Sequence, residues 1–308
     1  MIGPDPTPGR LRLVDRLLLG YFALNSLLLL HPNRPANWAA LAAFHALYLV
    51  GIPLMARFGQ RHWFVARLRD WYPLAGLIIM YTELQYLNRV LTDRFFDDII
   101  QRWELGLFGH QLAITLRQWL PWKWLGEAVH FGYFTYYFIA PSLLIPLWVQ
   151  KKRAEFRMAT GVIGLAYIFC YLFYVYFPVT GPYWQFPRPD PDAEGWFFPQ
   201  LMNHIVAGGS SRGSAFPSSH IAATVTALGM AWRYHRTVFV IILPLVVLLT
   251  LGTMYGGFHY GIDALGGVLT GLFFGVMGPR ILAAAGESLA VLGRAGMAGG
   301  ARPDARAR

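Results

Sequence analysis

The chain has 308 residues, of which 56% are hydrophobic and only 14% are charged, and its formal net charge is +10. Soluble domains carry about 25% charged residues, so this composition excludes an ordinary soluble protein and predicts a polytopic membrane protein. The net charge does not indicate nucleic-acid binding, because the basic residues lie at the ends of apolar stretches rather than in one patch. The single cysteine, Cys170, excludes an intrachain disulfide and a cysteine metal site.

Eight apolar stretches follow one another along the chain, and each has roughly the 20 residues that a helix needs to cross the hydrocarbon core of a bilayer. They cover residues 13–30, 37–56, 72–91, 128–149, 159–178, 217–232, 237–255 and 260–279. The sequence therefore predicts an all-α fold, a polytopic transmembrane helix bundle with about eight spans.

The basic residues indicate the orientation of this bundle, because lysine and arginine concentrate in the cytoplasmic loops of membrane proteins. If the N-terminus is cytoplasmic, the groups that lie inside are Arg10, Arg12 and Arg16; Arg57, Arg61, Arg67 and Arg69; Lys151, Lys152, Arg153 and Arg157; Arg233 and Arg236; and the arginines from Arg280 onward. We therefore expect a multi-pass protein of the cell membrane with both termini in the cytoplasm. Residues 1–9 and 286–308 are expected to be tails, the second of them cytoplasmic.

Two segments between the predicted spans are not expected to cross the membrane, and the first of them is also too apolar to be a free loop. In residues 92–126, charged side chains alternate with apolar ones and tryptophans follow, which suits helices that lie in the outer headgroup layer. This segment is either a lid or a wall that admits lipid to a site, or an interfacial helix that only packs. Residues 179–216 are rich in proline and aromatic residues, and we expect them to roof the polar runs that follow.

Two short polar runs at the boundaries of apolar stretches hold the densest cluster of catalytic-type residues. The first, residues 213–220, ends in Pro217, Ser218, Ser219 and His220. It has the pattern of a helix start, with Pro217 in the first turn and with backbone N–H groups and hydroxyls available to bind an anion. The predicted orientation places both runs on the extracytoplasmic face.

The second run, residues 253–263, pairs His259 with Asp263. A separation of four residues places both side chains on one face of a helix, where the carboxylate can accept a proton from one imidazole nitrogen. The other nitrogen can then act as a nucleophile or a base.

Both runs resemble the motifs of the type 2 phosphatidic acid phosphatase superfamily, Pro-Ser-x-His followed after one span by His-x-x-x-Asp. The residue pattern from Thr253 to Gly267 is most similar to that of the inositol phosphorylceramide synthase branch. The resemblance implies that His259 attacks phosphorus to form a phosphohistidine and that Asp263 orients it. It also implies that His220 protonates the leaving alkoxide and later activates the acceptor.

The same resemblance implies a set of phosphate-binding residues. They are Ser218, Ser219, Arg188 and Arg212. The superfamily pattern usually has two further cations, but this chain has Thr253 where the arginine is expected and Gly181 where the lysine is expected. The serines and nearby backbone amides would stabilise the charge on the phosphoryl oxygens.

The resemblance further implies a catalytic bundle with a six-helix core within residues 71–285. Two accessory helices within residues 1–70 precede this bundle.

The leading prediction is an integral-membrane phosphatase that hydrolyses a lipid phosphoester or pyrophosphate at the extracytoplasmic face, without a metal or another cofactor. A zinc site built from the two histidines and the aspartate is less favoured, because of the resemblance and the adjacent serines. The functional alternatives are a lipid phosphotransferase that resembles inositol phosphorylceramide synthase and a non-catalytic lipid transporter or scaffold. The expected partners are a membrane lipid substrate and the bilayer.

Overall fold

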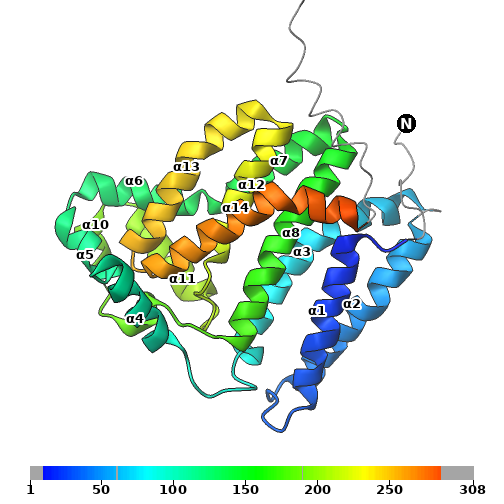
Figure 1. The fold of residues 1–308 in the computed structure, drawn as a ribbon, viewed down its shortest axis with the longest axis horizontal. Coiled ribbons are helices and arrows are strands. Elements are labelled where there is room, and N and C mark those ends of the chain that lie inside the picture. Colours follow the sequence, from blue (N-terminus) through cyan, green and yellow to red (C-terminus); the bar gives the residue numbers. More distant parts are fainter. Residues whose placement is uncertain (1–9, 60–61, 189, 286–308) are drawn as a thin grey trace, which may run out of the picture.

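The computed structural model describes residues 10–59, 62–188 and 190–285, and this part of the chain is built from helices without a β-strand (Figure 1). The helices are α1 (Leu13–Ser26), η1 (Leu27–Leu30), α2 (Trp38–Phe58), α3 (Trp63–Leu87), α4 (Asp97–Phe108), α5 (Leu112–Trp119), α6 (Lys123–Phe134), α7 (Tyr136–Val149), α8 (Arg153–Tyr176), α9 (Pro182–Gln185), α10 (Pro191–Glu194), α11 (Phe198–Gly209), α12 (Ser219–Tyr234), α13 (Arg236–Tyr255) and α14 (Gly261–Ala284). The predicted all-α bundle is confirmed. The predicted tails, residues 1–9 and 286–308, lie outside the described residues.

Five segments in the described part are long and apolar enough to cross a membrane: α1 with η1, α2, α8, α13 and α14. The helices α6 and α7, which meet at an angle of 45°, form a sixth if they are one broken span. The other two predicted spans, 72–91 and 217–232, correspond to α3 and α12, which are not among the segments that qualify. α12 has only 16 residues and packs against α7, α8, α13 and α14. The sequence thus predicts the helices correctly but overestimates the number that qualify as spans.

Close packing of α12 on α14 brings the two polar runs together. Three glycines at four-residue spacing on α14, Gly267, Gly271 and Gly275, face α12. A Cβ on Gly271 would lie 2.5 Å from the Cβ of Val225 and 2.8 Å from the carbonyl oxygen of Ala222, so a larger residue would force the helices apart. Small residues at such an interface allow two backbones to approach closely, and the starts of α12 and α14 meet as a result.

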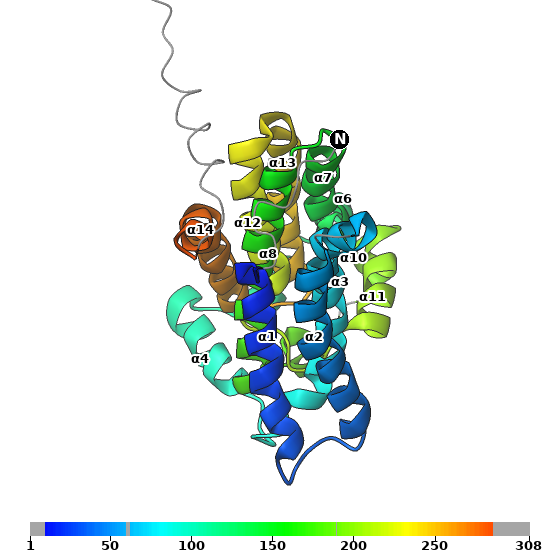
Figure 2. The ribbon, with the colours of Figure 1, turned by 90° about the vertical axis from the view of Figure 1, so that its right-hand side faces the viewer.

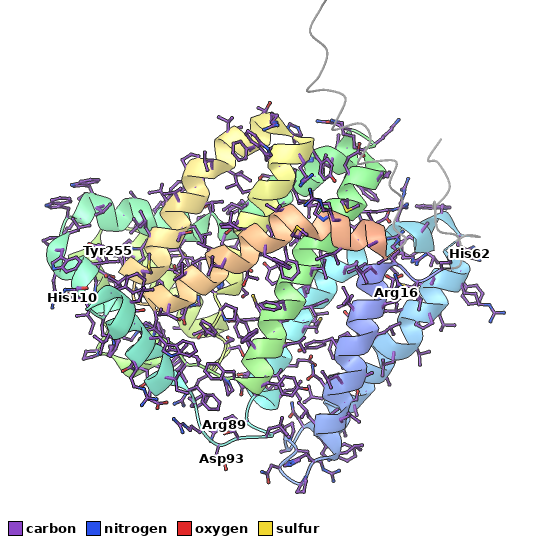
Figure 3. The ribbon with its side chains drawn as sticks, in the orientation of Figure 1. Arg16, His62, Arg89, Asp93, His110 and Tyr255 are labelled. Carbon is purple, nitrogen blue, oxygen red and sulfur yellow. The ribbon has the colours of Figure 1, made fainter. Side chains whose placement is uncertain are left out.

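Charged side chains join the helices at the other end of the bundle, away from the starts of α12 and α14. Asp70 of α3 pairs with Arg12, the N-cap of α1, at 2.9 Å and with Arg157 of α8 at 2.7 Å. Arg16 of α1 donates to the carbonyl oxygen of Ala285, just after α14, at 2.7 Å (Figure 3). The starts of α1, α3 and α8 and the end of α14 therefore lie together, and α1 and α2 form one edge of the bundle (Figures 1 and 2). Loss of one partner of a buried ion pair typically costs about 3–5 kcal/mol, so this network ties the first helices to the rest.

Candidate active site

The first polar run forms the start of α12. Ser218 is the N-cap of this helix and is fully buried, and its N–H donates to the carbonyl oxygen of Asp263 at 3.0 Å. Pro217 precedes the cap, so the expectation that it occupies the first helical turn is wrong. Tyr174 fixes the same turn, because its hydroxyl donates to the Pro217 carbonyl oxygen at 2.7 Å and accepts from the Ser219 N–H at 2.8 Å. The cap and this tyrosine together set the direction in which α12 leaves the turn.

The second run lies in the turn between α13 and α14 rather than on a helix. Because α14 begins at Gly261, His259 precedes it, and the expected shared helical face does not form. The side chains meet nevertheless: Oδ2 of Asp263 accepts from the Tyr260 N–H at 2.9 Å and lies 3.4 Å from Nδ1 of His259. Burial lowers the pKa of His259 to about 4, although the nearby Ala215 carbonyl partly opposes this shift. The imidazole is therefore neutral near pH 7.

His220 and His259 face each other across one cavity. Their ring centroids are 5.8 Å apart, with an angle of 61° between the rings. The ring of His220 also lies 4.4 Å from that of Tyr136, at the start of α7, and 5.5 Å from that of Tyr133, near the end of α6. Nδ1 of His220 is buried and has no hydrogen-bond partner among the described residues. A buried nitrogen without a partner is costly, so this position suits a group that binds a ligand.

The cavity has a volume of about 660 Å³ and is polar at one end only. The polar end is lined by the two histidines and by Thr180, Ser210, Ser211, Ser214 and Ser219. The remaining wall consists mainly of aromatic and aliphatic side chains of α3, α7 and α8. A cavity of this size, largely apolar with a few converging polar groups, is typical of a small-molecule site. Within the described ranges, no group of three or more His, Cys, Asp or Glu side chains could hold a metal ion.

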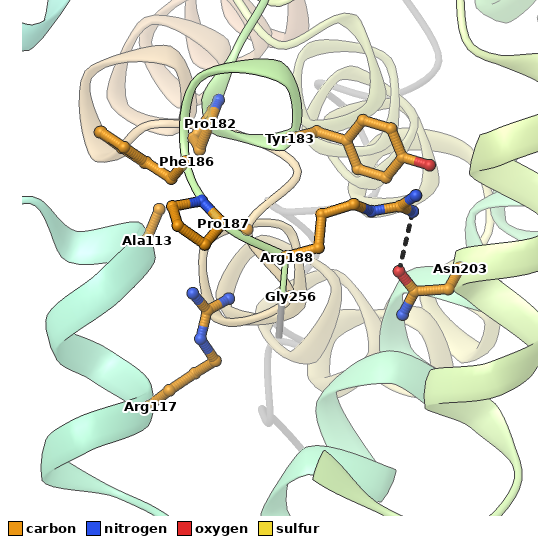
Figure 4. Close-up of a pocket in the computed structure, with 10 residues that line it drawn as sticks. Ala113, Arg117, Pro182, Tyr183, Phe186, Pro187, Arg188, Asn203 and Gly256 are labelled. Carbon is orange, nitrogen blue, oxygen red and sulfur yellow. Dashed lines mark hydrogen bonds between the residues drawn. The ribbon is translucent and has the colours of Figure 1, made fainter. Parts of the chain in front are cut away.

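The two arginines expected to bind phosphate lie outside this cavity, and none of the described residues that line it is a lysine or an arginine. The guanidinium of Arg188 stacks on the ring of Tyr183 at 3.8 Å, and that of Arg212 lies 5.4 Å from the ring of Trp184. Both of these rings line the cavity. Arg188 borders a smaller pocket instead, where it donates to Oδ1 of Asn203 at 3.1 Å (Figure 4). Each arginine thus lies beside an aromatic ring that lines the cavity.

Comparison with protein families agrees with the motifs. A model of the PAP2 superfamily matches residues 99–276, which is more than half of the chain and includes both polar runs. The chain belongs to the PAP2 superfamily. Comparison with curated proteins and with solved structures gives no significant match. The PAP2 segment begins within α4 and ends within α14, so α1, α2 and α3 precede it.

A buried carboxylate at the start of α4, at the edge of the PAP2 segment, holds the turns around both motifs, although it belongs to neither motif. Asp97 accepts hydrogen bonds from the N–H and the hydroxyl of Thr180, from the N–H of Gly181 and from the hydroxyl of Tyr260, at 2.9, 3.0, 2.9 and 3.1 Å. The backbone just before Thr180 pairs with residues 213–215, which lead into the first motif. Asp97 therefore connects the backbone before the first motif to the residue that follows His259 in the second.

A second buried carboxylate of α4, that of Glu104, caps the start of α14. Its Oε2 accepts from the Ile262 N–H at 2.8 Å, and its Oε1 accepts from the Leu112 N–H at 3.0 Å. The segment 92–126 is therefore more than an interfacial packing helix, because the inner face of α4 supports the second motif of the PAP2 fold. The spacing of Asp97, Gln101 and Glu104 (i, i+4, i+7) places them on one helical face, and this pattern is the sequence signal that could have identified them.

A cluster of polar side chains lies beside the turn that precedes His259, and Figure 4 shows one of them, Arg117, near Gly256. Arg117 of α5 donates to the carbonyl oxygen of Tyr255 at 3.2 Å, and its Nε lies 3.8 Å from Glu194, which lies 3.7 Å from Nε2 of His130. Gly257 has φ 68°, and a Cβ there would lie 2.9 Å from Nη1 of Arg117, so this turn requires glycine. Burial raises the pKa of Glu194 to about 7, although Arg117 opposes the shift.

Proposed function

We propose that this PAP2 protein is an integral-membrane lipid phosphate phosphatase that hydrolyses a phosphoester or pyrophosphate bond through a phosphohistidine intermediate. The observation that carries the proposal is the single cavity in which His220 and His259 face each other at the polar end of an otherwise apolar wall. A phosphate group beside the histidines and a hydrocarbon chain along the wall would match both parts of the cavity.

In the proposed reaction, Nε2 of His259 attacks phosphorus and the bond from phosphorus to the leaving alkoxide breaks. The attack needs a lone pair at neutral pH, and burial supports this because it lowers the pKa of His259 to about 4. Asp263, 3.4 Å from Nδ1, would hold the tautomer with a proton on Nδ1 and stabilise the positive charge that develops on the ring. The negative charge of the bound phosphate would favour a proton on His220, which would donate that proton to the alkoxide. His220 would then accept a proton from the water that attacks phosphorus as the bond to His259 breaks.

The charge on the phosphoryl oxygens requires hydrogen-bond donors or cations. Ser219 lines the cavity and would donate its hydroxyl, whereas the buried Ser218 would act by fixing the start of α12. Arg188 and Arg212 would reach the phosphate by moving away from the rings of Tyr183 and Trp184, beside which they now lie. In this proposal no metal or other cofactor takes part.

We further propose that the histidines lie at the extracytoplasmic face and that both termini are cytoplasmic. The basic residues at the starts of α1 and α8 support this orientation, because they lie together at the end of the bundle away from the histidines. A membrane protein with lysines and arginines concentrated in this way usually keeps that end in the cytoplasm.

A second candidate is a lipid phosphotransferase, in which a lipid alcohol replaces water as the acceptor. The residue pattern from Thr253 to Gly267, which resembles that of inositol phosphorylceramide synthase, favours this phosphotransferase. The backbone at Thr253 also holds the turn that carries His259. Its carbonyl oxygen accepts from the N–H groups of Phe258 and His259 at 3.0 and 2.9 Å. A non-catalytic lipid transporter or scaffold is the third candidate, since no cation among the described residues lines the cavity.

The test supplies purified protein with phosphatidic acid, with a polyprenyl diphosphate, or with phosphatidylinositol and ceramide. Free phosphate from the first two substrates supports hydrolysis, a new phosphosphingolipid supports transfer, and no turnover of any substrate supports the third candidate. His259→Ala should abolish turnover, and His204→Ala, a change at an exposed histidine, should not. Full activity of His259→Ala would contradict the phosphohistidine.

A further inference from the structure

The apolar part of the cavity is a groove of defined length that starts at the histidines. Three helices line it, and each does so over a stripe that runs from the histidine end to the far end: Tyr81 to Trp71 on α3, Tyr136 to Ile145 on α7, and Tyr171 to Ile163 on α8. At 1.5 Å per helical residue, the stripes are about 15, 13 and 12 Å long. The three lengths agree, so the groove extends roughly 12–15 Å beyond the polar end.

The groove changes in polarity along its length. Beside the histidines the wall is rich in tyrosine, and the hydroxyl of Tyr81 accepts from the Ser211 N–H at 3.1 Å. Farther along, the wall becomes aliphatic, with residues such as Leu74, Leu144 and Ile163. A wall that is polar at one end and aliphatic at the other matches an amphiphile whose charged group lies at the histidines.

The far end of the groove is closed by aromatic rings. The ring of Trp71 lies 5.3 Å from that of Trp148 and 4.9 Å from that of Phe156, which is fully buried. Aromatic clusters of this kind pack tightly and present a large apolar surface. Trp71 is therefore the floor against which the end of a chain in the groove would lie.

The groove is open along one side. α3 and α7 each pack against α8, and the cavity lies between them. At its rim, Ile78 of α3 is 72% exposed and Ile145 of α7 is 52% exposed. Large exposed apolar side chains on helices of this kind are suited to contact with the hydrocarbon core of a bilayer. A chain can therefore enter sideways from the membrane, without passing the histidine end first.

We propose that this groove holds the hydrocarbon chain of the lipid phosphate and that Trp71 sets the longest chain that fits. The proposal rests on the proposed function, since it places the reacting phosphate at His220 and His259. It identifies the substrate as a lipid phosphate whose chain lies alongside α3, α7 and α8, pointing away from the histidines. Because α3 precedes the matched segment 99–276, a helix outside the PAP2 segment would determine chain length.

The test measures kcat/KM for a series of alkyl and prenyl phosphates of increasing chain length and for p-nitrophenyl phosphate, which has no chain. Consumption of the phosphate donor is followed with and without a lipid alcohol, so that hydrolysis and transfer are both detected. Trp71→Ala should extend the accepted chain length. Leu74→Trp, which fills the groove one turn from its floor, should lower kcat/KM for long chains at least tenfold and leave p-nitrophenyl phosphate unaffected. Ile79→Trp is the matched control, because Ile79 is on α3 and 44% exposed but does not line the cavity.

The possible outcomes separate this inference from the function on which it rests. A shift of the chain-length profile in opposite directions for Trp71→Ala and Leu74→Trp, with the profile of Ile79→Trp unchanged, supports the groove. Unchanged profiles in both groove variants, with p-nitrophenyl phosphate still consumed, overturn the groove and leave the phosphohistidine chemistry standing. Failure of the wild type to consume any phosphate donor overturns both. If Trp71→Ala does not fold, the Leu74→Trp and Ile79→Trp pair decides the question.

Discussion

Replacement of Asp97 by alanine tests whether α4 supports the histidine turns. The carboxylate of Asp97 accepts four hydrogen bonds, from Thr180 (two), Gly181 and Tyr260, and it is only 4% exposed. Asp97→Ala would leave these four buried hydrogen-bond donors without their acceptor. At about 1 kcal/mol for each donor, the loss of stability is about 4 kcal/mol. For a protein of this size, that loss corresponds to a fall in Tm on the order of 10 °C.

The assay is thermal unfolding in detergent together with turnover of the preferred substrate. Asp98→Ala is the matched control, because Asp98 is the next residue of α4 and pairs only with exposed arginines, Arg94 and Arg102, in the described part of the chain. We expect Asp97→Ala to lower both Tm and kcat and Asp98→Ala to leave both near the wild-type values. Equal Tm values for the two variants, with full turnover in both, would refute the reasoning that α4 fixes these turns.

The remaining predictions concern the acid, the buried glutamate and the glycine turn. His220→Ala should lose turnover with poor leaving groups and retain part of it with good ones, since an activated leaving group needs less protonation; equal loss with both would contradict the acid role. The folded-state pKa of Glu194, about 7, exceeds its ordinary value, so the stability that it contributes is complete below about pH 4.5 and is lost as pH rises through 7. Tm of the wild type should therefore fall between pH 6 and pH 8, and in Glu194→Gln this fall should be smaller; the same fall in both proteins would contradict the shift. Gly257→Ala should cost about 1–3 kcal/mol in unfolding measurements because of its positive φ, and Gly208→Ala, where a Cβ meets nothing within 4 Å, serves as its control. Equal stabilities of these two glycine variants would show that the turn tolerates a side chain.

The sequence predicted the parts of this fold that depend on local patterns. Apolar stretches of suitable length gave the helices, and the motifs identified the superfamily that the match to residues 99–276 confirms. Two of the eight predicted spans, α3 and α12, are not among the described segments that are long and apolar enough to cross a membrane. α12 falls short because it has only 16 residues, which its apolar pattern alone did not reveal.

The details of the site depended on contacts between residues far apart in the chain. Spacing placed His259 and Asp263 close together, as the structure has them, but for the wrong reason, since His259 precedes the helix on which Asp263 lies. The bonds from Asp97 to Thr180 and to Tyr260 join residues that are 83 and 163 positions apart, and no local pattern indicates such partners. The clustering of Arg117 with Glu194 arises in the same way, because α10 packs against α6 and brings Glu194 within 3.8 Å of Arg117 on α5.

The most direct test of the account is to trap the covalent intermediate. Purified protein is mixed with a substrate labelled on its phosphate, quenched within the first turnover and digested, and the labelled peptide is identified. The account predicts an acid-labile, base-stable phosphoramidate on His259, absent from His259→Ala and still formed in His220→Ala when the leaving group is a good one. Label on any other residue, or turnover of substrate by His259→Ala, would contradict it.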